Sequence, residues 1–177
     1  MMHKVNELFG TDVINQATGA RIALVRDVVL ATDLRQIAAL ILSSGGLFSD
    51  ELVVRWPAII SRSDVIVVAG TSPLLTVKQD AEVAELRKLA VRITGLAVIT
   101  ASGDQLGTVS DIGFDDQGRV LGYEITHGLL GGLTGHRFLP SECVQSVGKD
   151  AIIATTAELS SVKEFERALG EQKDAAA

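Results

Sequence analysis

The stretch QLGTVSDIGFDDQGRVLGYEIT, which spans residues 105–126, predicts a β-hairpin. Its outer parts, 105–114 and 120–126, contain many of the Val, Ile and Leu residues that favour a buried strand face. The run Asp115-Asp116-Gln117-Gly118 between them consists of turn formers and ends in glycine. Polar turn residues between two apolar runs indicate antiparallel strands joined by a tight turn.

The same pattern occurs a second time, earlier in the chain. Val25 and Asp27 recur as Val109 and Asp111, 84 residues later. Other residues recur in the same order with a drift of a few positions, which loop insertions and deletions explain. These pairs are Gly10/Gly95, Val13/Val98, Gly19/Gly103, Arg35/Arg119, Ile41/Ile125, Pro57/Pro140 and Asp64/Asp150. The chain is therefore interpreted as a duplicated unit.

Each copy is expected to form a small barrel of five or six short strands. A closed sheet leaves no exposed edge, which suits a chain that is 47% hydrophobic. The expected strands are 12–15, 21–31, 36–43, 51–56 and 64–69 in the first copy, and 97–100, 105–114, 120–126, 137–139 and 151–155 in the second.

Two helices are expected outside the barrels. Val83, Leu86 and Ala90 have helical spacing within 79–90, and an apolar side also runs along 158–169. In the second helix, Ser161 and Glu164 have the spacing of a capping box, and Gly170 is the expected stop. The fold class is mainly β, with barrels in residues 1–78 and 92–156, a linker helix in 79–91, and a C-terminal helix and tail in 157–177.

Each copy resembles the PRC-barrel, the domain of the photosynthetic reaction centre H subunit and of the C-terminal half of the ribosome maturation factor. The resemblance covers residues 8–69 and 93–155. In the second copy it rests on Gly107-Thr108-Val109-Ser110-Asp111, Gly118-Arg119-Val120-Leu121-Gly122, the loop 128–132 and Leu139-Pro140. In the first copy it rests on 23–27, Arg35-Gln36-Ile37, 45–48 and Trp56-Pro57, with Ala23 where the pattern prefers Gly.

The resemblance implies a non-catalytic adaptor that docks onto other macromolecules. The transmembrane helix of the H subunit and the N-terminal domain of the maturation factor have no counterpart in this sequence, so neither specific function is carried over. We expect a scaffold for protein partners in a ribosome-linked, membrane-peripheral photosynthetic or cell-division assembly. Self-association is also expected.

The charge and hydropathy patterns exclude several classes of partner. Residues 1–78 carry seven basic and seven acidic side chains, so the net charge of −6 resides entirely in 79–177. Nucleic acid is disfavoured because phosphate backbones require clustered Lys and Arg. The chain has no run of about 20 apolar residues that could span a bilayer. We expect a cytoplasmic protein, with peripheral membrane association left open.

No catalytic, cofactor or metal site is expected. The residues His3, His127 and His136 lie in no hydrolase or zinc-protease signature. His127, His136 and Cys143 span a glycine-rich loop without a C-x-x-C anchor, which disfavours a metal. The loop 128–135 also lacks the Lys-Ser/Thr that completes a phosphate-binding loop.

The candidate partner-binding residues lie in and beside two glycine-rich loops. Bulky apolar side chains in such loops are costly to expose, so they either dock a partner or pack against the barrels. They are Leu47 and Phe48 in the first loop, and Leu129, Leu130, Leu133, His136 and Arg137 in the second. Asp27, Asp111, Pro57 and Pro140 are interpreted as structural turn residues, the two Asp accepting backbone N–H bonds.

A second hypothesis is a small-ligand binder or an enzyme that uses a groove between the barrels. It predicts a discrete pocket with convergent polar groups. Stabilisation by members of a metabolite panel would favour it over the adaptor. An RNA binder is weakened by the acidic second half.

Overall fold

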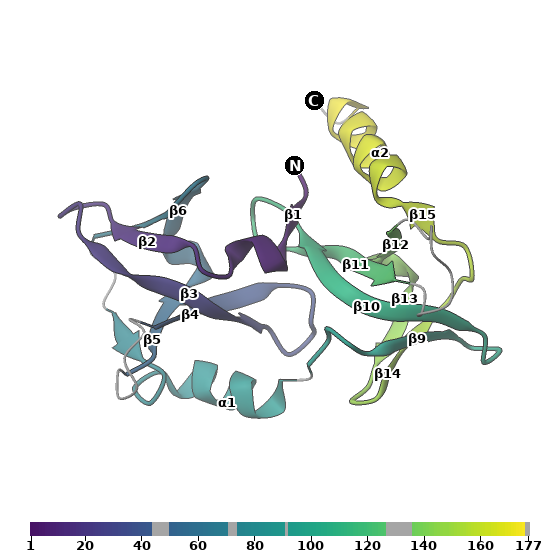
Figure 1. The fold of residues 1–177 in the computed structure, drawn as a ribbon, viewed down its shortest axis with the longest axis horizontal. Helices are drawn as coiled ribbons and strands as arrows, with labels where there is room; N and C mark the ends of the chain where they lie inside the picture. Colours follow the sequence, from purple (N-terminus) through teal and green to yellow (C-terminus); the bar gives the residue numbers. More distant parts are fainter. Residues whose placement is uncertain (44–49, 71–73, 91, 127–135, 176–177) are drawn as a thin grey trace. The chain divides into compact units, whose positions relative to one another are not determined.

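The computed structural model describes residues 1–43, 50–70, 74–90, 92–126 and 136–175. Its contacts divide the chain into two compact units (Figure 1). The first unit is Val5–Ala90. The second unit is Val91–Ala177 together with Met1–Lys4. The helix expected as a linker is thus counted with the first unit, and the four N-terminal residues with the second.

The first unit is a curled seven-stranded sheet in the order β6-β7-β2-β3-β4-β5-β8. Neighbouring strands are antiparallel, except for the parallel pair β2 and β7. In chain order its elements are the 3-10 turn η1 Val5–Leu8, β2 Asp12–Asn15, β3 Arg21–Leu30, β4 Ile37–Ser43, β5 Leu52–Arg55, η2 Trp56–Ala58, β6 Ile59–Arg62, β7 Ile66–Val68, β8 Leu75–Thr76 and α1 Ala81–Leu89.

The second unit repeats this sheet in the order β13-β14-β9-β10-β11-β12-β15, and β1 pairs with β10 in addition. The parallel pair is β9 and β14. Its elements are β1 His3–Lys4, β9 Ala97–Thr100, β10 Gln105–Phe114, β11 Val120–Thr126, β12 Arg137–Pro140, η3 Ser141–Cys143, β13 Val144–Val147, β14 Ala151–Ala154, β15 Ser160–Ser161 and α2 Val162–Ala175. The expected class, mainly β with two tandem barrels and two helices, is confirmed.

Strand register corrects one pair of the sequence repeat. Asp27 lies opposite Ile41 in the first sheet, and Asp111 lies opposite Glu124 in the second. Ile41 therefore corresponds to Glu124, and pairing it with Ile125 is wrong. The cause is the turn between β10 and β11, which is one residue shorter than the turn between β3 and β4.

Asp27 and Asp111 lie inside strands, which corrects their interpretation as turn residues. Each follows a β-bulge, at the register shifts between Val25 and Asp27 and between Val109 and Asp111. The carboxylate of each accepts the backbone N–H of the next residue, at 2.9 Å from Val28 and 2.8 Å from Ile112. The two prolines do adjoin turns: Pro57 lies in η2, and Pro140 immediately precedes η3.

Other differences concern short strands and one helix end. Strands β1, β6, β8, β13 and β15 were not among the expected strands. Two residues are too few to show a strand period in β1, β8 and β15, and β6 and β13 each contain two consecutive polar residues that interrupt the apolar pattern. The capping box of α2 is confirmed: the Ser161 amide donates to Glu164 Oε2 at 2.8 Å, and the Glu164 amide donates to Ser161 Oγ at 3.2 Å. Gly170 does not end the helix, which continues to Ala175.

The two units fill the same sheet face differently. In the first unit, α1 inserts the fully buried Val83 into a cluster formed by Val29, Ala39, Ile41 and Val53. The corresponding residues of the second unit are Gly113, Gly122, Glu124 and Phe138. There the Phe138 ring occupies the space left by the two glycines, and Phe165 of α2 stacks on it with ring centroids 4.3 Å apart.

Candidate functional site

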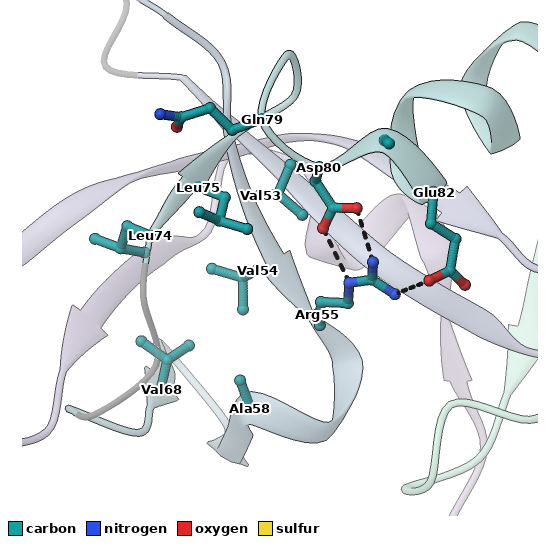
Figure 2. A pocket seen from close by; sticks show the side chains of 11 residues that line it. Val53, Val54, Arg55, Ala58, Val68, Leu74, Leu75, Gln79, Asp80 and Glu82 are labelled. Carbon is teal, nitrogen blue, oxygen red and sulfur yellow. Dashed lines mark hydrogen bonds and ion pairs between the residues drawn. The ribbon is translucent and has the colours of Figure 1, made fainter.

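The first unit contains a pocket of about 480 Å³. Its wall comes from separate elements: β5, η2, β7, the segment leading into β8 and the first turn of α1. Figure 2 shows aliphatic side chains around one common space. They are Val54, Ala58, Val68, Leu74 and Leu75; Val53 also borders the pocket, but its side chain packs in the core cluster with Val83. Leu74 is 39% exposed, so this lining reaches the surface.

One side of the pocket carries charges that are paired with one another. Arg55 donates from Nε to Oδ2 of Asp80 at 2.9 Å and from Nη2 to Oδ1 at 2.7 Å. A third bond runs from Arg55 Nη1 to Glu82 Oε2 at 2.7 Å (Figure 2). A guanidinium held by two parallel bonds to one carboxylate is a rigid pair, so the orientation of Arg55 is fixed.

Asp80 also begins α1. Its Oδ1 accepts the backbone N–H of Val83 at 3.1 Å, which caps the helix. Burial alone would raise the pKa of the Asp80 carboxyl, but the bonds from Arg55 and from the Val83 amide together outweigh it and hold that pKa below its ordinary value. Asp80 and Glu82 in turn raise the pKa of Arg55. The ion pair is therefore fully charged at neutral pH.

The pocket is suited to apolar groups. Its volume lies within the range of about 300–1,000 Å³ that is usual for ligand pockets. Two carboxylates face one guanidinium, so Arg55 has no uncompensated charge to offer an anion. An apolar occupant would gain free energy by removing aliphatic surface from water.

The comparisons place the sheets in a family. The family model of the PRC-barrel domain matches residues 1–75 and, a second time, residues 87–160. The chain belongs to the PRC-barrel family. A comparison with curated proteins found no match. The two matches cover most of the two sheets, so each unit contains one PRC barrel. The pocket lies in the first unit, and residues 79–82 of its wall follow the end of the first match.

Of the expected partner-binding residues, only two can be located in these PRC barrels. Leu47, Phe48, Leu129, Leu130 and Leu133 lie outside the described residues. His136 contacts Glu124, with Nδ1 2.5 Å from Oε1. Arg137 donates from Nε to the carbonyl oxygen of Leu159 at 3.1 Å, with a second bond from Nη2 to the same oxygen. Both side chains thus have partners within the second unit.

A second polar cluster surrounds Glu124 in the second PRC barrel. The Glu124 side chain is only 7% exposed, and Lys4 Nζ lies 2.5 Å from its Oε2. Ser110 Oγ donates to Oε1 at 3.4 Å, beside His136. Sequence reasoning missed this cluster. The available signal was Glu124 itself, an acidic residue within the apolar strand sequence VLGYEIT. The sequence repeat gave it no counterpart in the first copy.

The pocket of the first PRC barrel was also missed. Its available signals were Arg55, the one charged residue in the apolar run LVVRW, and Asp80, three residues before the helical Val83. An isolated charge in a strand needs a partner from elsewhere in the fold. Sequence alone does not identify Asp80 as that partner, because the two are 25 residues apart.

The described residues contain no group of three or more His, Cys, Asp or Glu side chains that could hold a metal ion. Within the described part of the chain, no helix is long and apolar enough to cross a membrane. Burial, with a smaller contribution from Glu142, raises the pKa of the Cys143 thiol. A protonated thiol is a poor nucleophile.

Proposed function

We propose that this PRC-barrel protein is a non-enzymatic adaptor that binds a protein partner, and that the pocket of the first unit receives apolar side chains of that partner. The observation that carries the proposal is an aliphatic pocket, open at Leu74, whose charged groups are already paired. Anchoring side chains that fill preformed apolar pockets dominate the affinity of many protein complexes.

The chemistry of the pocket supports binding over catalysis. A general acid or base must reach a substrate proton and change its charge near the working pH. Asp80 is held ionised by Arg55, and its pKa is shifted away from neutrality. The same side chain caps α1, so its position serves the fold.

The setting that we propose follows from the family. The PRC-barrel resemblance implies a module that docks onto a larger assembly. As the setting of this adaptor we therefore propose a ribosome-linked, membrane-peripheral photosynthetic or cell-division complex in the cytoplasm. The acidic balance of the chain, with a formal net charge of −6, favours a protein over a nucleic acid as the partner.

Two exposed apolar residues of the first unit allow a matched test. Leu74 lines the pocket and is 39% exposed, whereas Ile60 on β6 is 51% exposed and does not line it. A crosslinked partner would be identified by mass spectrometry, purified, and titrated against the wild type, Leu74→Gln and Ile60→Gln. We expect Leu74→Gln to weaken binding roughly tenfold or more and Ile60→Gln to leave it within about twofold. Equal binding by both variants would contradict the proposal.

A second candidate function is the binding of a small apolar ligand, which the volume of about 480 Å³ also favours. The two candidates differ in thermal stability assays with a metabolite panel. The adaptor predicts no change in melting temperature. A compound that raises the melting temperature of the wild type and of Ile60→Gln, but not of Leu74→Gln, would favour the ligand binder.

A further inference from the structure

The N-terminal strand is packed in one unit and connected to the other. Residues 1–4 are counted with the second unit, but the chain runs from Lys4 directly into Val5, the first residue of the first unit. The strand pairs with the end of β10, beyond the residues that pair with β9: His3 pairs with Phe114 and Lys4 pairs with Gly113. Because this ladder is only two residue pairs long, few backbone hydrogen bonds hold it.

The side chains of the strand make specific contacts. Lys4 forms the ion pair with the buried Glu124, whose Oε2 has no hydrogen-bond partner among the described residues apart from this contact. The His3 Nε2 atom lies 2.7 Å from Oδ1 of Asp116, and its ring centroid lies 5.6 Å from that of Phe114. The second unit thus has a built site for an extended segment with a lysine at one defined position.

Met2 adds an apolar contact to the same site. A Cβ atom on Gly113 would come within 2.9 Å of the Met2 sulfur, so the missing side chain leaves room for methionine. The corresponding residue in the first sheet is Val29, and the residue that corresponds to Glu124 is Ile41. The first sheet therefore offers neither this space nor this charge.

We propose that β1 is an exchangeable strand, and that the second unit of one molecule accepts Met2, His3 and Lys4 of a second copy of this chain. The exchanged strand would make the same ladder, ion pair and methionine contact, so exchange loses none of the contacts described for β1. Its cost is the entropy of association, which makes the dimer favourable only as the protein concentration rises. The proposal does not depend on the pocket of the first unit.

Charge reversal distinguishes exchange from intramolecular pairing. Lys4→Glu places two carboxylates together within one molecule, and Glu124→Lys places two ammonium groups together. In an equimolar mixture of the two variants, the residue at position 4 of each chain is opposite in charge to the residue at position 124 of the other chain. Exchange of the two strands therefore restores the ion pair in both units. We expect native mass spectrometry to show a concentration-dependent dimer of the wild type, monomers of each variant alone and a heterodimer in the mixture. The double variant Lys4→Glu/Glu124→Lys should behave as the wild type.

A mixture that contains only monomers, while the double variant regains wild-type stability, would overturn the proposal. A second assay applies if Glu124→Lys does not fold. A labelled peptide of residues 1–6, MMHKVN, is titrated into the Lys4→Glu chain, beside a peptide with Glu at position 4. We expect the natural peptide to bind at least tenfold more tightly and Leu74→Gln to leave this preference unchanged. Equal affinity of the two peptides would refute the exchange.

Discussion

The ring of Phe138 lies against Gly122, at a point where a Cβ atom would come within 2.6 Å of its Cε1 atom. In the first unit the corresponding residues are Val53 and Ala39, and the space above them is filled by Val83 from α1. The two barrels thus share a strand order but not a way of covering this face. In the second unit Phe138 covers Gly113 and Gly122, whereas in the first unit Val83 of α1 covers the corresponding face.

The first prediction concerns the packing of the Phe138 ring against Gly122. Gly122→Ala would press a methyl group against Phe138 and against the carbonyl oxygen of Leu139. We expect a loss of about 1–3 kcal/mol in the free energy of unfolding, measured with urea. Gly122→Ala/Phe138→Val removes the contact with the ring but keeps the contact with the Leu139 carbonyl oxygen, so it should remain destabilised, though by less than the sum of the single variants. Strict additivity would show that the ring and the glycine are not coupled.

The second prediction concerns Asp80, which both pairs with Arg55 and caps α1. Asp80→Ala should lower the free energy of unfolding by about 2–4 kcal/mol, because it removes two charge-assisted bonds and a helix cap together. Glu82→Gln is the matched control: Glu82 is 67% exposed, and its loss should cost less than about 1 kcal/mol. Similar losses in the two variants would refute a special role of Asp80.

The third prediction is a pH dependence that follows from the same carboxyl group. The pKa of Asp80 in the folded chain is lower than its ordinary value of 3.8. Its stabilising contribution is therefore complete above the unfolded pKa and is lost as the pH falls through the folded pKa. Between neutral pH and about pH 2, the wild type should lose more stability than Asp80→Asn. Parallel stability curves from urea titrations would contradict the assignment.

The fourth prediction concerns the capping box of α2. Ser161→Ala removes the hydroxyl that accepts the Glu164 amide at 3.2 Å. The cap is worth about 1 kcal/mol, so the first turn of α2 should fray. Amide hydrogen exchange should become faster in 162–165 and remain unchanged in α1, where the cap is Asp80. Unchanged protection in α2 would show that Phe165, stacked on Phe138, holds the turn by itself.

Much of the fold was predictable because apolar periodicity and turn residues are local signals. The hairpin of β10 and β11 matches the expected residues, and Ser161 with Glu164 marks the start of α2. The two-residue strands β1 and β15 carry no such signal, since their pairing depends on distant partners. Gly170 failed as a stop because a glycine is tolerated inside a helix at about 1 kcal/mol.

The two polar clusters were beyond sequence reasoning for a related reason. Arg55 and Asp80 meet only after β5 and α1 pack, and Lys4 reaches Glu124 across 120 positions of sequence. The turn between β10 and β11 is one residue shorter than the turn between β3 and β4, which shifts the alignment of the two copies by one position. Ile41 was therefore aligned with Ile125 instead of Glu124. Strand register, which sequence alone did not fix, is what brings these charges together.

The most direct test of the adaptor is photocrosslinking in living cells from the pocket itself. A benzophenone amino acid would be placed at position 74 in one chain and at position 60 in another, and adducts would be identified by mass spectrometry. The account predicts one dominant protein adduct from position 74, absent from position 60 and lost when Ala58→Trp fills the pocket. Identical adduct patterns at the two positions, or a pattern insensitive to Ala58→Trp, would contradict it.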